Sequence, residues 1–511
     1  MDYGLLLRTV SHLKPLQVFY QVKYRLKKPA YVALESSIIG TPKMKTAFIA
    51  KYKCAKGDVF SFLNMEHPFA GWNFTDNGML WAYNQNYFDW INQEDMSSGE
   101  GCKWIDRFID ELPSNKIGLD PYPIALRSIN WIKFFCRFPE NATKPRLDSL
   151  YSQVKLLEKK LEYHLLGNHL LEDACALYIA ASFFQDEKLL KKATKLLLSQ
   201  LEEQTLPDGA HYEQSPMYHS ILLDRLLDCI NIAPKDELKA FAQKQLGWLK
   251  SICYQDGSFP FFNDTALGIA PVPNDIIDYA RRLGIESEAT PLKESGYRKM
   301  SNSIMEVFVD VGNITASYQP GHSHADTFNY ELRIDGQPVI VDTGISTYNK
   351  DARRQYERST AAHNTVLVGG QDSSRVWGGF RVGRRAEVTV LEDKPNELTA
   401  YHNGFGRQAI HQRRFFFNGK SLCVEDEIIG RSGNEAISYV HFSPGIHVEF
   451  VSEPDGVLKA GDIMLKIKYF KRLQLKKDFV SSEYNNLQQS LVLEMKFAHL
   501  LQYEITKTTE Q

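Results

Sequence analysis

The residues best suited to chemistry lie in the second half of this 511-residue sequence. The stretch GHSHADTFNYELRIDGQPVIVDTG (residues 321–344) carries His322 and His324 at its head and Asp342 near its end, and His363 follows in RSTAAHNTVLVGG. Imidazoles and carboxylates bind divalent cations such as zinc, and histidine is also a common general base near neutral pH. Three interpretations are therefore open: a metal site, a catalytic base, or ordinary hairpin chemistry.

The Asp335-Gly336 dipeptide inside this stretch predicts a tight β-hairpin turn, because both residue types tolerate the backbone angles of such turns. His324 and Asp342 would then lie on opposite arms of the hairpin and could converge at its open end. With His363 at the entry to a further strand, two imidazoles and one carboxylate would suit a tetrahedral divalent cation with one open position. Hydrogen-bonded histidines at a strand edge are the alternative.

His322 precedes His324 by two residues, and residues i and i+2 of an extended segment face the same side. We therefore expect His322 to border the metal ligands without binding the ion. A neutral imidazole in that position could accept a proton near pH 7.

Two polar clusters occur in the first half of the chain. The segment GNHLLEDACALY places Asn168 and His169 at an expected helix start, with Glu172 one turn further on. These residues could belong to a site. In the structural alternative, Asn168 is only a helix N-cap and Glu172 completes a partial capping box.

The second cluster is the segment LPDGAHYEQSPMYHS. Its Ser215-Pro216 pair fits the start of a helix, with serine as the cap and proline at the first position. Capping does not account for the titratable residues crowded around the pair, which are His211, Tyr212, Glu213, Tyr218 and His219. Loops with many such groups are candidate sites.

A third polar loop, DGSFPFFNDT, holds Asp256, Asn263 and Asp264 among phenylalanines. Aromatic loops of this kind can stack on sugar rings. Packing into the protein core is the stronger expectation.

The periodicity of apolar residues changes once along the chain. Between residues 121 and 282, segments such as SLYSQVKLLEKKLEYHLL and SILLDRLLDCINIA place apolar residues at i, i+3, i+4 and i+7, which predicts helices. From about residue 303 the period is two, in short β-branched and aromatic runs separated by turn dipeptides. We therefore predict a helical domain with an N-terminal extension over residues 1–300 and a β-sandwich domain over residues 301–511.

Composition excludes several classes of partner. The net charge of -2 gives no overall attraction to nucleic acid or to an anionic membrane. The seven cysteines are dispersed without a CxxC pair, which indicates reduced cysteines. No apolar run reaches the roughly 18 residues of a transmembrane helix, so we expect no transmembrane segment.

The N-terminal sequence MDYGLLLRTVSHLKPLQVFYQVKYRLKKP lacks the long apolar block of a secretory signal, because Arg8 directly follows GLLL. We therefore expect a cytoplasmic protein, or a periplasmic one if the natural chain begins further upstream. The basic, aromatic opening is expected to pack as a peripheral helix. A position on a membrane surface is the alternative.

The motifs described above closely resemble those of heparinase II/III-type polysaccharide lyases. The resemblance runs from about residue 150 to the C-terminus, and the pattern GHxHAD…VDTG…AHNTV is long and specific. It implies an incomplete (α/α) toroid followed by an antiparallel β-sandwich, in agreement with the two halves read from periodicity. It also implies a bacterial lyase that cleaves an acidic polysaccharide containing uronic acid, such as a glycosaminoglycan of the heparin or heparan sulfate type, by β-elimination.

The resemblance also implies roles for individual residues. Tyr218 matches the catalytic tyrosine, the general acid that protonates the leaving oxygen. Asn168 matches the residue that neutralises the substrate carboxylate, with His169 beside it, and His322 matches the second catalytic base. The implied substrate-binding or supporting residues are Glu172, Glu213, Tyr348 and Arg358.

The implied metal ligands are His324, Asp342 and His363. The ion in relatives is commonly zinc or calcium, and we expect zinc first. Its expected role is structural, because it would fix the strand ends that carry His322.

These residue types suit β-elimination at a uronic acid. The C5 proton is weakly acidic, so the neighbouring carboxylate must be neutralised to stabilise an enolate-like state, and preorganised donors do this best away from water. A tyrosine with the ordinary pKa of about 10 is a poor base at pH 7. Cationic neighbours must therefore favour its phenolate, or Tyr218 must serve as the acid while His322 takes the proton.

Two other functions stay open as alternatives. One is a non-catalytic glycan-binding or surface-polysaccharide assembly protein on the same fold, since YQVKYRLKKP resembles family members associated with the production of bacterial surface polysaccharides. The other is a metal-dependent glycan hydrolase on this scaffold. The sequence indicates no particular oligomeric state.

Overall fold

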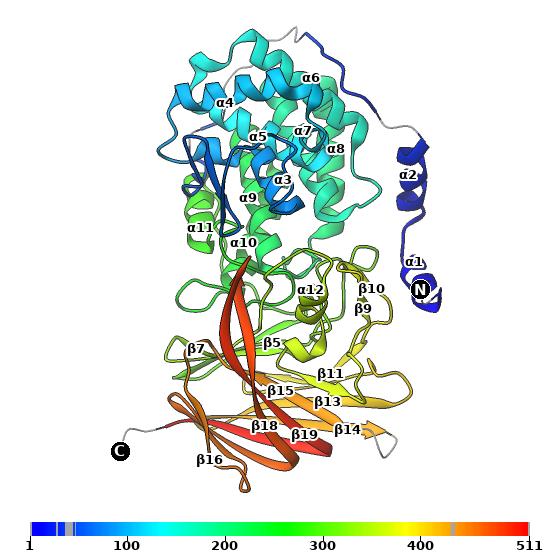
Figure 1. Ribbon diagram of the computed structural model, residues 1–511, viewed down its shortest axis with the longest axis vertical. Coiled ribbons are helices and arrows are strands. Elements are labelled where there is room, and N and C mark those ends of the chain that lie inside the picture. Colours follow the sequence, from blue (N-terminus) through cyan, green and yellow to red (C-terminus); the bar gives the residue numbers. More distant parts are fainter. Residues whose placement is uncertain (1–2, 27–28, 36–43, 46, 431–434, 509–511) are drawn as a thin grey trace.

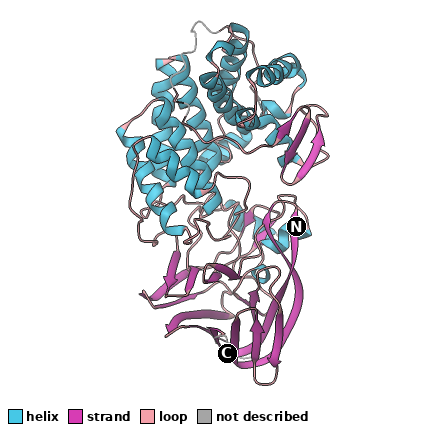
Figure 2. Cartoon of the chain, turned by 90° about the vertical axis from the view of Figure 1, so that its left-hand side faces the viewer, coloured by secondary structure: helices cyan, strands magenta, loops and turns pink. Residues whose placement is uncertain are grey.

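A computed structural model describes residues 3–26, 29–35, 44–45, 47–430 and 435–508. The chain forms a helical domain and a β-domain stacked along the long axis of the molecule, as Figures 1 and 2 show. Two N-terminal helices lie to one side, next to both domains (Figure 1). None of the described helices is both long and apolar enough to cross a membrane.

The helices lie almost entirely in the first half of the chain. They are α1 (Tyr3–Val10), α2 (Pro15–Leu26), α3 (Met79–Tyr87), α4 (Ser98–Glu111), α5 (Pro121–Arg137), α6 (Lys144–Lys160), α7 (Gly167–Phe184), α8 (Glu187–Gln204), α9 (Pro216–Ile232), α10 (Asp236–Ile252), α11 (Pro273–Arg282) and α12 (Ala352–Glu357). Short 3-10 helices occupy Asp89–Asn92, Leu112–Ser114, Ile117–Leu119, Pro139–Asn141 and Thr360–Ala362.

Helix α7 is the centre of the helical domain. It is rich in apolar residues, and all of its residues except His169 are buried. Such a helix has to be surrounded by other helices, and α7 packs against α5, α6, α8 and α9. The polar N-terminal end of α7 is thereby held at a fixed place at the end of the bundle, facing the β-domain.

A small antiparallel sheet in the helical half was not predicted from the sequence. Its strands are β1 (Ala55–Lys56), β2 (Val59–Phe62) and β3 (Met65–Pro68). Phe60 and Phe62 of β2 point into an aromatic cluster with Trp81, Trp90 and Trp104. Burial of these rings stabilises strands too short to give a clear periodic signal.

The β-domain contains two larger antiparallel sheets that pack face to face around one apolar core. The smaller sheet has the order β4 (Tyr297–Ser301), β5 (Met305–Asp310), β6 (Tyr330–Ile334), β7 (Gln337–Ile340). The larger has the order β11 (Val388–Lys394), β12 (Glu397–His402), β13 (Ala409–Asn418), β14 (Ser421–Gly430), β19 (Asn486–Lys507), β18 (Ile463–Glu483), β17 (Val457–Ala460), β16 (Val448–Ser452). In the same sheet β15 (Ala436–His441) also pairs with β19, and β8 (Val366–Val368) pairs with β15. A separate hairpin consists of β9 (Val376–Trp377) and β10 (Arg381–Val382).

The predicted fold class is confirmed: a helical toroid-type domain is followed by an antiparallel β-sandwich. The predicted hairpin also forms. Strands β6 and β7 pair with Ile334 opposite Gln337, and the two turn residues have φ angles of 50° at Asp335 and 76° at Gly336. Positive φ at both positions is the geometry that matches the twist of a two-residue hairpin.

The junction between the two domains lies between α11 and β4. Helix α11 ends at Arg282 and β4 begins at Tyr297, so the predicted limit at residue 300 falls within β4.

A second connection between the domains is the long hairpin of β18 and β19, which rises from the sandwich to the helices in Figure 1. At its tip, Ser482 accepts a backbone hydrogen bond from Leu267 at 2.7 Å, and the Asn485 amide donates to the carbonyl of Leu63 at 2.9 Å. Tyr484 of this tip packs in a small apolar cluster with Met217 and Ile345. The hairpin therefore fastens the sandwich to the helical domain beside the start of α9.

Candidate active site

Residues from both domains meet where the helical bundle contacts the sandwich. Asn168, Glu213 and Tyr218 come from the helical domain, and His322 and Tyr348 come from loops of the β-domain. The ring centroids of Tyr218 and His322 are 3.9 Å apart, and the hydroxyls of Tyr218 and Tyr348 are 3.2 Å apart. The structure thus brings together residues more than a hundred positions apart in the sequence.

Tyr218 is held at the first turn of α9. The side chain of Ser215 accepts a hydrogen bond from the backbone N–H of Tyr218 at 3.2 Å, with Pro216 at the first helical position, as predicted. The same hydroxyl donates to the backbone carbonyl of Asp264 at 2.6 Å. Ser215 therefore joins the start of α9 to the loop that carries Asp264.

Asn168 lies at the start of α7 and is held by Glu213. The backbone N–H of Asn168 donates to Glu213 Oε1 at 2.9 Å, and its side-chain amide donates to Glu213 Oε2 at 2.8 Å. The preceding Gly167 has a φ of 61°, and a Cβ there would lie 2.5 Å from Glu213 Oε1, so only glycine fits. The capping interpretation of Asn168 is wrong: Leu166 is the N-cap and makes no side-chain cap bond.

His322 is oriented by a buried carboxylate. Its Nδ1 lies 2.8 Å from Asp264 Oδ2, and because a carboxylate only accepts, Nδ1 is the donor. In the neutral ring Nε2 then carries the lone pair. Nε2 lies 3.4 Å from the amide nitrogen of Asn168 and 3.4 Å from Glu213 Oε2. This arrangement turns Nε2 toward residues of the helical domain.

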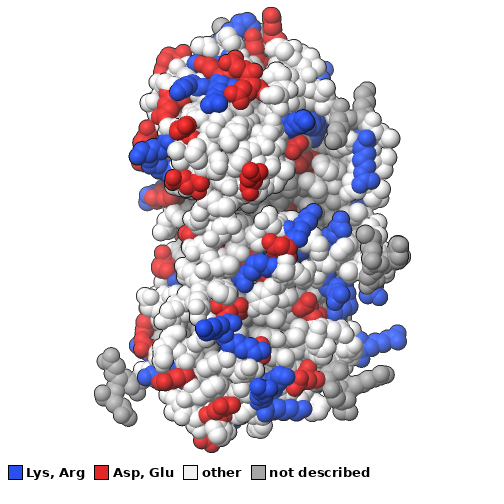
Figure 3. Space-filling model, in the orientation of Figure 1, with Lys and Arg blue, Asp and Glu red and all other residues white. Residues whose placement is uncertain are grey.

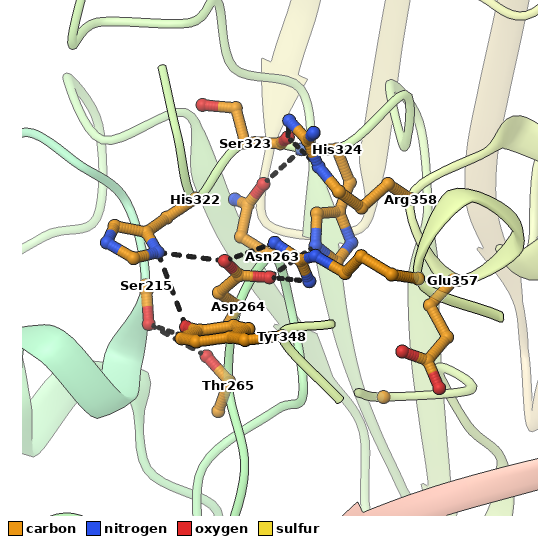
Figure 4. Close-up of polar contacts among 12 residues, drawn as sticks. Ser215, Asn263, Asp264, Thr265, His322, Ser323, His324, Tyr348, Glu357 and Arg358 are labelled. Atoms are coloured by element: carbon orange, nitrogen blue, oxygen red, sulfur yellow. Dashed lines mark hydrogen bonds and ion pairs between the residues drawn. The ribbon is translucent and has the colours of Figure 1, made fainter. Parts of the chain in front are cut away.

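Asp264, in the loop between α10 and α11, is the centre of a polar network that joins this loop to residues of the β-domain (Figure 4). Its two oxygens accept hydrogen bonds from the guanidinium of Arg354 at 2.5 and 2.7 Å. Oδ1 is also 2.8 Å from His324 Nε2, so one carboxylate holds both histidines of the GHSH motif. Burial alone would raise the pKa of Asp264, but Arg354 and the two histidines outweigh it and hold the pKa well below its usual range. Asp264 is therefore ionised throughout the physiological range.

Tyr218 is suited to act as an acid. Burial raises the pKa of its phenol, an effect only partly offset by the hydrogen bond with Tyr348. The pKa of Tyr348 is raised in the same way, chiefly by burial and then by Asp264. Both hydroxyls are protonated at neutral pH.

His169 lies at the edge of this group. Its Nδ1 is 3.2 Å from Glu162 Oε2, its ring lies 4.8 Å from that of Tyr122, and 29% of its side chain is exposed. Burial lowers its pKa, but Glu162 and Glu213 raise it by more. His169 can therefore bring positive charge close to Asn168.

Two predicted substrate-binding residues lie away from the rest. Glu172 is completely buried inside the helical bundle, and its carboxylate is 3.2 Å from Arg225 Nε. Arg358 is also buried, and its guanidinium donates to the backbone carbonyl of Ser323 at 2.7 Å. Arg358 thus supports the loop between His322 and His324, and neither side chain reaches the surface at Tyr218.

The three predicted metal ligands lie close together. His363 Nδ1 is 2.8 Å from Asp342 Oδ2, and the rings of His324 and His363 are 5.2 Å apart. In the part of the chain that the structure describes, no three His, Cys, Asp or Glu side chains are arranged to hold a metal ion. Asp342 is instead engaged with His363 and with the amide of Asn329 at 2.5 Å.

The chemistry of these groups fits an ion nevertheless. His324 Nδ1, His363 Nε2 and Asp326 Oδ2 are buried polar atoms without a hydrogen-bond partner in the structure, and such atoms call for a water or an ion. A small cavity is lined by His324 and Asp326, among other residues. Two free imidazole nitrogens near carboxylates are a donor set that zinc accepts. The metal stays a prediction.

Sequence reasoning missed two members of the site. Asp264 lies in an aromatic loop that the sequence predicts to pack into the core, and no sequence motif distinguishes Arg354. Asp264 lies 58 positions before His322 and Arg354 lies 32 positions after it, so no local sequence pattern predicts that the three residues interact. The only available signal was charge density, since Arg354 lies in KDARRQYERST.

Comparison with known protein families agrees with the architecture. The model described as "Heparinase II/III N-terminus" matches residues 134–278, and the one described as "Heparinase II/III-like, C-terminal" matches residues 285–496. Together they cover more than half of the chain, which therefore belongs to the heparinase II/III-like family.

Relatives and solved structures are distant in sequence. A heparin-sulfate lyase of Bacteroides stercoris is 21% identical over 491 residues, covering 82% of this chain and 72% of the relative. A heparin-sulfate lyase of Pedobacter heparinus is 25% identical over 334 residues, covering 57% of this chain and 49% of the relative. A crystal structure of heparinase III superposes with a TM-score of 0.66 at 14% identity, covering 97% of this chain and 92% of that one. The structural likeness shows the shared fold.

Proposed function

We propose that this protein is a polysaccharide lyase that cleaves a uronate-containing acidic polysaccharide by β-elimination. The observation that carries the proposal is the pairing of an oriented imidazole with a protonated phenol. Asp264 accepts a hydrogen bond from His322 Nδ1, so that a neutral ring carries its lone pair on Nε2, and the ring of Tyr218 lies 3.9 Å from that imidazole. An acid and a base within one substrate's reach are what this elimination needs.

In the proposed reaction His322 Nε2 removes the proton at C5 of the uronate. The electron pair forms the C4–C5 double bond, the bond from C4 to the glycosidic oxygen breaks, and the Tyr218 hydroxyl gives its proton to that oxygen. In the structure, the side-chain amide of Asn168 donates to Glu213 and lies within hydrogen-bonding distance of His322 Nε2. On substrate binding it would turn a hydrogen toward the carboxylate and stabilise the enolate-like state.

The substrate class follows from the relatives, which are named heparin-sulfate lyases. We propose a glycosaminoglycan or a bacterial uronate polysaccharide as the substrate. The test is a panel of heparan sulfate, heparin, chondroitin sulfate, hyaluronan and alginate, followed by the ultraviolet absorbance of the unsaturated uronate product. Absorbance on at least one glycan is expected. Glycan binding without cleavage would favour the non-catalytic alternative.

We also propose that His324 and His363, with Asp342, hold a structural zinc ion. Bound zinc would cross-link the loop that carries His322 to the strand ends around it. Replacement of His324 by alanine should remove the metal measured by elemental analysis and lower the Tm. Full metal content in His324→Ala, or its absence from the carefully prepared native protein, would contradict the assignment.

The cytoplasmic location stays a prediction, with the periplasm as the alternative. Cell fractionation with an antibody against the full-length protein decides between the two.

A further inference from the structure

The N-terminal helix α2 packs on the protein with its polar side. Gln17 is buried and donates its amide to the carbonyl of Leu165 at 3.0 Å. Tyr20 stacks on Tyr163 with ring centroids 4.7 Å apart, and the hydroxyl of Tyr24 donates to the carbonyl of Leu161 at 2.7 Å. The face of α2 that contacts the helical domain therefore consists of hydrogen-bonding residues.

The opposite face of α2 is apolar and points outward. Phe19 is 60% exposed, Val22 is 51% exposed and Leu26 is 83% exposed. Surface helices normally bury such a stripe and turn their polar residues to water. Nine of the twenty large hydrophobic side chains that are exposed among the described residues fall between residues 7 and 34. This concentration marks an interaction surface, whereas scattered single residues would not.

The charged residues of the N-terminal segment that contains α1 and α2 are all basic. Residues 3–34 contain no aspartate or glutamate, and their six basic residues are Arg8, Lys14, Lys23, Arg25, Lys27 and Lys28. On a helical projection with about 100° per residue, Lys23 and Arg25 fall on the two borders of the apolar stripe. Figure 3 shows basic side chains, without a cluster of acidic ones, along the edge that α1 and α2 occupy.

The neighbouring hairpin extends the basic surface. Helix α1 contacts it, because Thr9 accepts a hydrogen bond from the Trp377 indole at 3.2 Å. Arg381 of β10 lies over the Trp377 ring at 4.7 Å. Burial lowers the pKa of Arg384, and the nearby Arg375 and Arg8 lower it further, as expected where cations crowd together.

We propose that α1 and α2 form a docking element for an anionic membrane surface, with the apolar stripe entering the lipid interface and the basic residues contacting lipid headgroups. A helix of this composition lies in the interface plane, and both its apolar area and its Lys and Arg residues contribute to binding. Two other occupants fit less well. A polyanionic glycan would bind the basic residues but leave Phe19, Val22 and Leu26 in water. A second copy docked through the same patch would place basic residues against basic residues.

The experiment is flotation of the full-length protein with phosphatidylcholine vesicles, with and without phosphatidylglycerol. The native protein is expected to bind the anionic vesicles at least tenfold more strongly than the neutral ones and to release them as salt rises. The triple variant Phe19→Ser, Val22→Ser, Leu26→Ser removes the stripe, and the double variant Lys23→Glu, Arg25→Glu reverses the charge. Each should reduce binding to anionic vesicles by at least tenfold.

The matched control replaces exposed apolar residues elsewhere: Val390→Ser with Leu391→Ser on β11, which should bind as the native protein does. All variants change exposed positions, and circular dichroism checks that they remain folded. The proposal is overturned if the native protein fails to bind anionic vesicles, or if the stripe variant binds them undiminished. It is also overturned if sedimentation velocity shows a dimer that the stripe variant abolishes.

Discussion

Two buried networks of this molecule use the same residue types and serve different ends. In the first, Asp264 binds Arg354 with both oxygens and holds His322 and His324. In the second, inside the sandwich, Asp426 binds Arg413 with both oxygens at 2.6 and 2.8 Å. The two networks have almost the same composition, so composition alone does not make a catalytic site.

In the second network, the histidines bond only to groups of the β-domain. His411 Nε2 lies 2.7 Å from Asp426, and its Nδ1 lies 3.1 Å from His402 Nε2. The remaining nitrogen of His402 accepts the backbone N–H of Gly404 at 3.0 Å. Every ring nitrogen is used within the β-domain, and burial lowers the pKa of both histidines.

The difference lies in where the outer nitrogen of the histidine faces. His322 Nε2 faces Asn168 and Glu213 of the other domain, next to a half-buried phenol. His411 faces a second buried histidine. A carboxylate thus orients a histidine in both places, and only in the first does the outer nitrogen face the other domain, where we propose that the substrate binds.

The largest effect is expected from Tyr218→Phe. It removes the proposed acid while the ring still packs against His322, so kcat should fall by about a thousandfold or more with little change in Tm. The control is Tyr178→Phe, which removes a buried hydroxyl that donates to the carbonyl of Ala233 at 2.6 Å. The control should cost about 1 kcal/mol of stability and leave kcat near native. Near-native turnover in Tyr218→Phe would refute the role of the phenol.

The functional difference between the two networks is tested by comparing the variants Asp264→Asn and Asp426→Asn. Each change leaves a buried arginine without its carboxylate and should destabilise by about 3–5 kcal/mol. Per folded molecule, Asp264→Asn should lower kcat at least about a hundredfold, because an asparagine amide can donate as well as accept and no longer fixes the His322 tautomer, while KM changes little. Asp426→Asn should keep native kcat. Equal losses of kcat in the two variants would remove the distinction drawn between the networks.

Acid stability follows from the second network. Burial alone would raise the pKa of Asp426, but Arg413 and His411 outweigh it and hold the pKa below its usual range. A carboxyl with a lowered folded-state pKa contributes stability above its unfolded pKa of about 3.9 and loses it as pH falls. In urea unfolding, the native protein should lose stability below about pH 4, and Asp426→Asn should show a shallower decline. Parallel curves would show that Asp426 contributes nothing to acid sensitivity.

The smallest effect is expected from His402→Gln. The side chain lies at the closed end of the second network, so kcat should stay within about twofold of native while Tm falls by a few degrees, as for an ordinary buried substitution. Scanning calorimetry and initial rates measure the two quantities. A tenfold loss of activity would mean that the sandwich network communicates with the site.

Much of the architecture was predictable because it depends on local patterns. Periodicity separated the helices from the strands, Asp335-Gly336 marked the β6–β7 hairpin, and Ser215-Pro216 marked the start of α9. The small β1–β3 sheet was missed because its strands are only two to four residues long and are stabilised by distant tryptophans.

The residues of the candidate site likewise fall into two groups: those that local motifs predict and those that depend on tertiary contacts. His322, Asn168 and Tyr218 belong to motifs that can be read from the sequence. Asp264 and Arg354 act through contacts across tens of residues, and the partner of Glu172 is a partly buried arginine on another helix, Arg225 of α9. Such pairings depend on tertiary packing, so residue type and spacing could not separate Glu172, which lies inside the bundle, from Glu213, which contacts Asn168.

The most direct test of the central claim is the stoichiometry of cleavage on the best glycan of the panel. Unsaturated uronate is measured by ultraviolet absorbance and new reducing ends are measured in the same samples. β-Elimination by His322 and Tyr218 predicts one unsaturated end for each new reducing end at every time point. New reducing ends without unsaturated uronate would contradict the account and show that this scaffold hydrolyses its substrate.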